Sequence, residues 1–130
     1  MKSTIIFVYN ADKELFDSLL NSTHKISSPS IYQCNLYYLT YTALGMRREW
    51  KQFLGTFKVP VEFWHRDEFK EEYSMDDVKL PAVFVKEGDN PELRIDADSI
   101  NHCKSINDLK VLIHGKLFDV FNNKPVVYTF

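Results

Sequence analysis

The chain begins with an uninterrupted apolar run and then changes to a helical spacing of apolar positions. Residues 4–9 form a β-branched and aromatic run, which is typical of a strand buried on both faces at a central place in a sheet. Apolar residues between Asp12 and Lys25 recur at helical spacing behind two acids in the first turn, which predicts an amphipathic helix. A second helical pattern extends from about Leu36 to Gly55, and Gly45 is the point at which it would kink or split.

The middle of the chain carries strand patterns. Residues 59–64 alternate between apolar and other side chains, with Pro60 near the start where a strand tolerates it. Polar residues mark the end of this strand, and a short, weakly helical segment follows over residues 67–73. Residues 82–85 are apolar again and predict another strand, which begins just after Leu80-Pro81.

A hairpin and a closing helix complete the pattern. Residues 86–91 are rich in Gly, Asn, Asp and Pro, and residues 92–96 alternate after them, so we predict a β-hairpin here. Ser105 and Asp108 resemble a capping box in front of a final amphipathic helix that ends near Leu117. Residues 126–130 are either a strand or an ordered extended end.

The predicted order is β, α, α, β, short α, β, β, α, and it indicates an α/β sandwich. We expect a mixed sheet of about four strands with helices on both faces. The chain has 130 residues, of which 45% are hydrophobic, and this composition is typical of one soluble globular domain over residues 1–130.

Charge and cysteine usage exclude several classes of partner and site. The chain has 16 Lys and Arg against 18 Asp and Glu, a net charge of −2, which removes the electrostatic case for nucleic acid or an anionic membrane. No apolar run approaches the roughly 18 residues of a membrane span, and the run over residues 5–9 is too short for the core of a signal peptide, so we expect no export signal. Cys34 and Cys103 match no disulfide framework, so we expect a cytoplasmic protein with reduced thiols. The histidines lack metal-site spacing, and we expect neither metal nor cofactor.

The order of elements, with a residue-Pro pair opening the hairpin, resembles the thioredoxin fold. This resemblance implies that Pro81 is cis and lies against an active-site thiol. Thioredoxin-like enzymes carry Cys-x-x-Cys at the start of a helix, because the helix N-terminus lowers the pKa of a thiol. This chain has Cys34-Asn35-Leu36-Tyr37 at the corresponding place. Asn35 is a plausible N-cap of the helix. Residues 32–50 also resemble an uncharacterised bacterial family that has a second Cys at the Tyr37 position.

The sequence departs from the thioredoxin pattern in two respects. Tyr37 cannot resolve a mixed disulfide, so thiol exchange would need Cys103 or a small thiol such as glutathione. The helix predicted over residues 12–25 stands between the first strand and Cys34, and strict chain order puts residues 10–13 at the position of the thiol.

Glycine spacing excludes nucleotide-binding loops. A P-loop needs two glycines five residues apart followed by Lys and Ser or Thr. Gly45, Gly55, Gly88 and Gly115 provide neither that spacing nor the patterns of a dinucleotide-binding loop or a nucleophile elbow. The chain is therefore not a P-loop GTPase.

Two function classes remain, and we favour the first slightly. In the first, the chain is a non-enzymatic binding or scaffold module, in which an exposed patch at Tyr32, Tyr37, Tyr38 and Tyr41 contacts a protein partner. In the second, the chain is a monothiol redox or thiol-transfer protein. There Cys34 is the nucleophile, Tyr37 donates a hydrogen bond, and Pro81 presents backbone to a substrate thiol. This second class requires an accessible thiol with a depressed pKa.

Two charged segments have alternative interpretations. Residues 65–68 lie at the predicted carboxyl end of a strand, where open α/β sheets bind ligands, although a simple polar strand exit is the preferred interpretation. Arg47 and Arg48 are candidates for binding an anion, but Glu49 follows directly, and exposed charges of an ordinary helix surface are the preferred interpretation.

Overall fold

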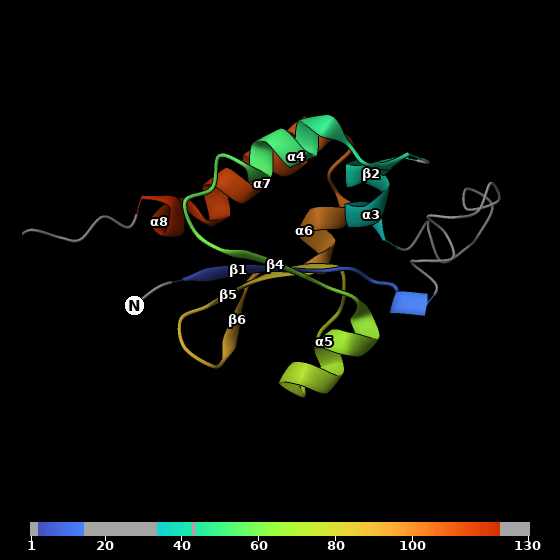
Figure 1. The fold of residues 1–130 in the computed structure, drawn as a ribbon, viewed down its shortest axis with the longest axis vertical. Helices are drawn as coiled ribbons and strands as arrows, with labels where there is room; N and C mark the ends of the chain where they lie inside the picture. The colour runs from blue at the N-terminus through green and yellow to red at the C-terminus, as the bar shows by residue number, and fades with distance from the viewer. Residues whose placement is uncertain (1–2, 15–33, 43, 123–130) are drawn as a thin grey trace, which may run out of the picture.

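A four-stranded mixed sheet lies at the centre of the molecule (Figure 1). The computed structural model describes residues 3–14, 34–42 and 44–122. The strand order is β4-β1-β5-β6. β1 (Thr4–Val8) pairs in parallel with β4 (Val61–Trp64) and antiparallel with β5 (Ala82–Lys86), which pairs antiparallel with β6 (Pro91–Ile95). The predicted mixed α/β class and the four-stranded sheet are therefore confirmed.

Six helices and one small hairpin accompany this sheet in the described ranges. The helices are α3 (Asn35–Thr40), α4 (Arg48–Leu54), α5 (Arg66–Tyr73), α6 (Ala97–Asn101), α7 (Ile106–Lys116) and α8 (Phe118–Phe121). The hairpin pairs β2 (Tyr41–Thr42) with β3 (Gly45–Met46). None of the described helices combines the length and the apolar composition needed to cross a bilayer.

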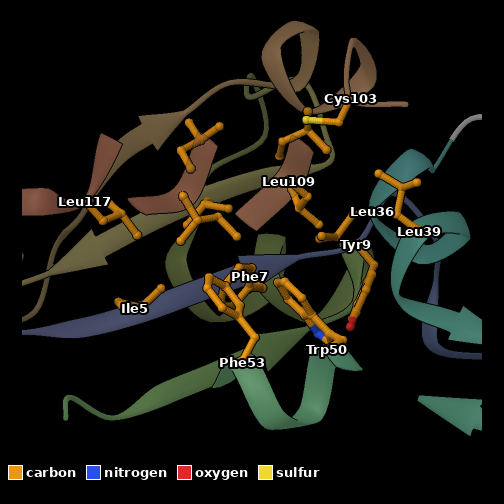
Figure 2. Close-up of a cluster of buried hydrophobic side chains, with 14 of the residues drawn as sticks. Ile5, Phe7, Tyr9, Leu36, Leu39, Trp50, Phe53, Cys103, Leu109 and Leu117 are labelled. Atoms are coloured by element: carbon orange, nitrogen blue, oxygen red, sulfur yellow. The ribbon is translucent and has the colours of Figure 1, made fainter. Parts of the chain in front are cut away.

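The two faces of the sheet pack against different helices. Alternate residues of β1 point to opposite faces, and all but Thr4 are completely buried. Ile5 and Phe7 join the larger core beneath α4 and α7, where the rings of Phe7 and Trp50 meet edge to face at 5.5 Å (Figure 2). Ile6 and Val8 join a smaller core with Phe69 of α5 on the other face. A strand buried on both faces was predicted for this segment and is confirmed.

The single helix predicted from Leu36 to Gly55 is wrong, because a hairpin interrupts it. α3 ends at Thr40, and β3 begins just after the turn, at Gly45, whose φ of +112° lies in the region that favours glycine. The Arg47 amide donates to the Thr40 carbonyl at 2.8 Å and closes the hairpin before α4 begins. The break at Gly45, considered as an alternative, is therefore what the structure contains.

The remaining predictions agree with the structure where it describes them. β4, α5, β5, β6 and α7 lie within about two residues of their predicted bounds. The Ser105 hydroxyl accepts from the Asp108 amide at 3.1 Å, which confirms the predicted cap. The short helices α6 and α8 were not predicted. Most of the helix predicted over residues 12–25, and the tail over residues 126–130, lie outside the described residues.

Candidate functional site

Three chain segments meet at one edge of the sheet. β1 and β4 are parallel, so their carboxyl ends lie together, and β5 runs the other way, so its start lies at the same edge. The Tyr9 amide donates to the Trp64 carbonyl at 3.0 Å, and the Arg66 amide donates to the Ala11 carbonyl at 2.9 Å. These bonds hold the two segments that follow β1 and β4 side by side.

Pro81 lies at this edge of the sheet. It is buried, and it precedes Ala82, which pairs with Val8 at the end of β1. The Leu80–Pro81 peptide bond is cis. Pro81 is therefore next to the segment that leaves β1.

Cys34 is also brought to the end of β1. Its Sγ accepts a hydrogen bond at 3.3 Å from the amide of Asn10, a residue 24 positions earlier in the chain. Chain order alone placed residues 10–13, and not Cys34, at this position. In the structure the two lie together, because the Cys34 thiol is hydrogen-bonded to Asn10 at the end of β1.

α3 is anchored by side chains at its start. Cys34 is the N-cap residue, which corrects the assignment of that role to Asn35. The Asn35 side-chain amide instead donates to the carbonyls of Ile100 and Cys103, each at 2.8 Å. These two bonds tie the start of α3 to the end of α6.

The Cys34 thiol has the properties of a core residue. Only 1% of its surface is exposed. Burial raises its pKa, while the Asn10, Tyr37 and Leu36 amides and the charge of Arg66 oppose that rise without reversing it. A reactive thiol requires access and a lowered pKa, and Cys34 has neither in this structure.

The other predicted site tyrosines fall in different environments. Tyr37 is 5% exposed and stacks on Tyr41, with ring centroids 5.3 Å apart. Burial raises the pKa of both phenols. Tyr38 is 58% exposed, Tyr41 is half-buried, and Tyr32 lies outside the described residues. Among the tyrosines that the structure describes in this segment, Tyr38 alone therefore has a mostly exposed ring.

A cavity of about 490 Å³ opens at the same edge of the sheet. Its walls include Asn10, Arg66, Lys70, Val78, Lys79 and Leu80. The sequence placed Arg66 at a strand end where ligands can bind, although a polar strand exit was the preferred interpretation, and it did not point to Lys70 or Lys79. The signal available for Arg66 was its place directly after β4, because ligand sites commonly form at the carboxyl ends of parallel strands.

Arg66 is the best-anchored cation of this cavity. Its Nε donates to Asp12 Oδ1 at 3.0 Å and its Nη1 donates to Asn10 Oδ1 at 3.2 Å. The neighbouring His65 turns away to Glu68, with Nδ1 and Oε1 2.7 Å apart. Of residues 65–68, Arg66 therefore lines the cavity, whereas His65 and Glu68 pair with each other.

The described residues contain no group of three or more His, Cys, Asp or Glu side chains that could hold a metal ion.

Comparisons with protein families, with curated proteins and with solved structures found no match to this chain. The chemistry of the site must therefore be argued from its own residues.

Proposed function

We propose that the chain is a non-enzymatic binding or scaffold domain with a thioredoxin-like arrangement and an incomplete thiol motif. Its order of elements supports the resemblance: a buried first strand, a helical segment leading to a parallel strand, then an antiparallel hairpin and a closing helix. Helices on both faces of the sheet agree with the same arrangement. Fold alone does not determine function, so the functional part of the proposal is argued from the environment of Cys34.

The burial of Cys34 is the observation that carries this proposal. Its sulfur accepts a backbone hydrogen bond in a site closed to solvent, and burial holds its pKa above the ordinary value. The second motif position holds Tyr37, whose ring is packed in the core. Cys34 and Tyr37 are therefore both packing residues of the core. This favours binding through the surface over thiol chemistry at this motif.

The proposed partner is an acidic protein surface that contacts Tyr38 and the β2–β3 hairpin. Leu44, at the turn of this hairpin, is 99% exposed, and Tyr38 on the preceding helix is 58% exposed; we propose that these two apolar side chains contact the partner together, since contact sites are marked by groups of exposed apolar residues. Arg47, Arg48 and Lys51 line a groove beside Leu44. Glu49 lines the same groove, and its carboxylate also lies 3.4 Å from Lys110, so the cations of the groove outnumber the carboxylate.

The alternative is a monothiol protein that uses Cys34. One observation favours it: the sulfur lies at the end of β1, the position that the thioredoxin resemblance assigns to the reactive thiol. A mixed disulfide at Cys34 would have to be resolved by Cys103 or by a small thiol, and Cys103 is itself buried. The alternative therefore requires the site to open first.

The pH dependence of Cys34 alkylation by iodoacetamide decides between these two functions. A Cys103→Ser background leaves Cys34 as the one thiol. We expect slow alkylation with a midpoint at or above the ordinary thiol pKa of about 8.5, because the thiolate is disfavoured by burial. The same protein in denaturant gives the reactivity of the exposed thiol. Rapid alkylation of the native protein with a midpoint well below this value would replace the binding proposal with the monothiol function.

A further inference from the structure

We infer that the cavity at the carboxyl ends of β1 and β4 binds a small organic anion, one that carries a phosphate or carboxylate group on an apolar body. This site lies beyond the proposed protein-binding role, and it uses different residues from those of the hairpin surface. Cavity shape, charge and the sheet topology each contribute to the inference.

The sheet topology places the cavity where ligands bind in α/β proteins. Open sheets bind ligands outside the carboxyl ends of parallel strands, because the connections leave a crevice there. Asn10 follows β1, Arg66 follows β4, and Leu80 precedes β5. Asn101, at the end of α6, closes another side of the cavity. Backbone from four separate elements therefore fixes its shape.

The charge on the walls favours an anion. Three cationic side chains, Arg66, Lys70 and Lys79, line the cavity, and no carboxylate does so among the described lining residues. Lys70 is half-buried and has no ion pair within the described ranges. Lys79 pairs with Asp98 at 2.9 Å, but both side chains are about 70% exposed, so this pair is weak and an anion can compete for the lysine.

Arg66 is oriented so that part of its guanidinium remains available. Asp12 engages Nε and the Asn10 side chain engages Nη1, while no described residue accepts from Nη2. Asp12 is ionised at neutral pH, as an aspartate ordinarily is, and its carboxylate holds the guanidinium in place; the same hydrogen bond lowers the pKa of the Asp12 carboxyl. A preorganised guanidinium loses less side-chain freedom when it binds an oxyanion.

The size and the apolar part of the wall indicate an organic ligand. Val78 and Leu80 face the cavity beside the cations. A volume of about 490 Å³ lies within the range of small-molecule sites, which is about 300–1,000 Å³. Inorganic phosphate would fill only a part of this space and would leave the apolar wall without a contact.

Three probes that share a ring but differ in charge test this inference. The full chain, labelled with ¹⁵N, is titrated with phenyl phosphate, benzoate and benzyl alcohol, and amide chemical shifts are followed at fixed pH and salt. We expect saturable shifts at Arg66, Lys79, Leu80 and Asn101 with at least one anion and weaker or no shifts with benzyl alcohol. Phenyl phosphate and benzoate distinguish a phosphate site from a carboxylate site.

Two lysine variants of equal charge change provide the control. Lys70→Gln removes a cation from the cavity, whereas Lys58→Gln removes one from an exposed position outside its walls. We expect Lys70→Gln to weaken binding of the preferred anion about two- to fivefold, as for a partly exposed ion pair. Lys58→Gln should leave the affinity unchanged. Both variants should keep the wild-type spectrum away from the substituted residue.

Three results would overturn the inference. The first is the absence of saturable shifts around the cavity with either anion. The second is equal binding of benzyl alcohol, which would show that charge plays no part. The third is an equal loss of affinity in Lys58→Gln and Lys70→Gln, which would show a general charge effect. None of these results bears on Cys34 alkylation, so the test is separate from that of the proposed function.

Discussion

At the scale of single residues, the Cys34 sulfur is a buried hydrogen-bond acceptor. Replacing Cys34 by Ala removes the acceptor of the Asn10 amide and leaves a small void. We expect a loss of about 1–3 kcal/mol in the free energy of unfolding. Cys34→Ser should lose less, because its hydroxyl can accept the same bond at the start of α3. Urea denaturation of the two variants measures the difference, and a greater loss in the Ser variant would contradict the acceptor role.

The raised pKa of Cys34 also makes stability depend on pH. The folded protein holds the thiol proton more tightly than the unfolded chain does, because burial disfavours the thiolate. Stability from this group is therefore complete below the unfolded pKa of about 8.5, and it is lost as pH rises through the folded pKa.

We expect the free energy of unfolding to fall between pH 8 and pH 10, and to fall less steeply in Cys34→Ser. Burial also raises the pKa of Tyr9, so part of the decline at the top of this range persists in the variant. Urea denaturation at several pH values measures both slopes. Equal slopes in the two proteins would show that Cys34 does not titrate differently in the folded state.

At the scale of elements, two glycines should respond to substitution with opposite sign. Gly45 in the hairpin has a φ of +112°, whereas Gly115 lies in α7, and an added Cβ meets nothing within 4 Å at either position. Backbone conformation therefore decides the result. We expect Gly45→Ala to cost about 1 kcal/mol or more, and Gly115→Ala to stabilise the helix by about 0.5–1 kcal/mol. Thermal unfolding of the two variants gives both signs, and a shift in the same direction would refute this explanation.

Element type was predictable where the apolar pattern was uniform. β1 and β5 are continuous apolar runs, α7 keeps one helical period, and each has clear end signals; the structure has these elements there. The region from Leu36 to Leu54 misled the prediction because Leu36, Leu39, Trp50 and Phe53 all enter the same core. Their spacing fits one helix, although two helices carry them. α6 has five residues, which is too short for a period to be recognised.

The site was less predictable, because it depends on contacts between distant residues. A polar strand exit at residues 65–68 was visible in the sequence, and Arg66 lies in the cavity. Lys70 and Lys79 carried no signal, since charged residues on helices and loops are usually solvated. The position of Cys34 beside Asn10 required a fold in which the chain returns to the end of β1.

At the scale of the whole molecule, the sheet separates two hydrophobic cores of unequal size. The smaller core depends on α5, whose one buried residue is Phe69. Its ring packs against Phe84 of β5 at 4.9 Å and against Tyr73 at 5.1 Å. α5 therefore covers its face of the sheet through the buried Phe69 and the half-buried Tyr73.

We expect Phe69→Ala to cost about 3–5 kcal/mol, as for a large aromatic residue removed from a packed core. Such a loss is a large part of the total stability of a domain of this size. Phe118→Ala is the matched control, because Phe118 is 65% exposed and its loss should change stability little. Urea denaturation compares the two, and similar losses would show that the smaller core contributes no more than the surface.

The outer strands of the sheet have a consequence for encounters between copies of the chain. An unpaired strand edge can act as a template for another strand and so start aggregation. β4 has four residues, follows Pro60 and carries Glu62, and β6 begins at Pro91 and carries the charged Glu92 and Arg94. Proline lacks a donor, and charged side chains oppose close stacking. Both outer strands are therefore poor templates for a strand of another copy. The residues of these strands themselves oppose edge-to-edge association of sheets.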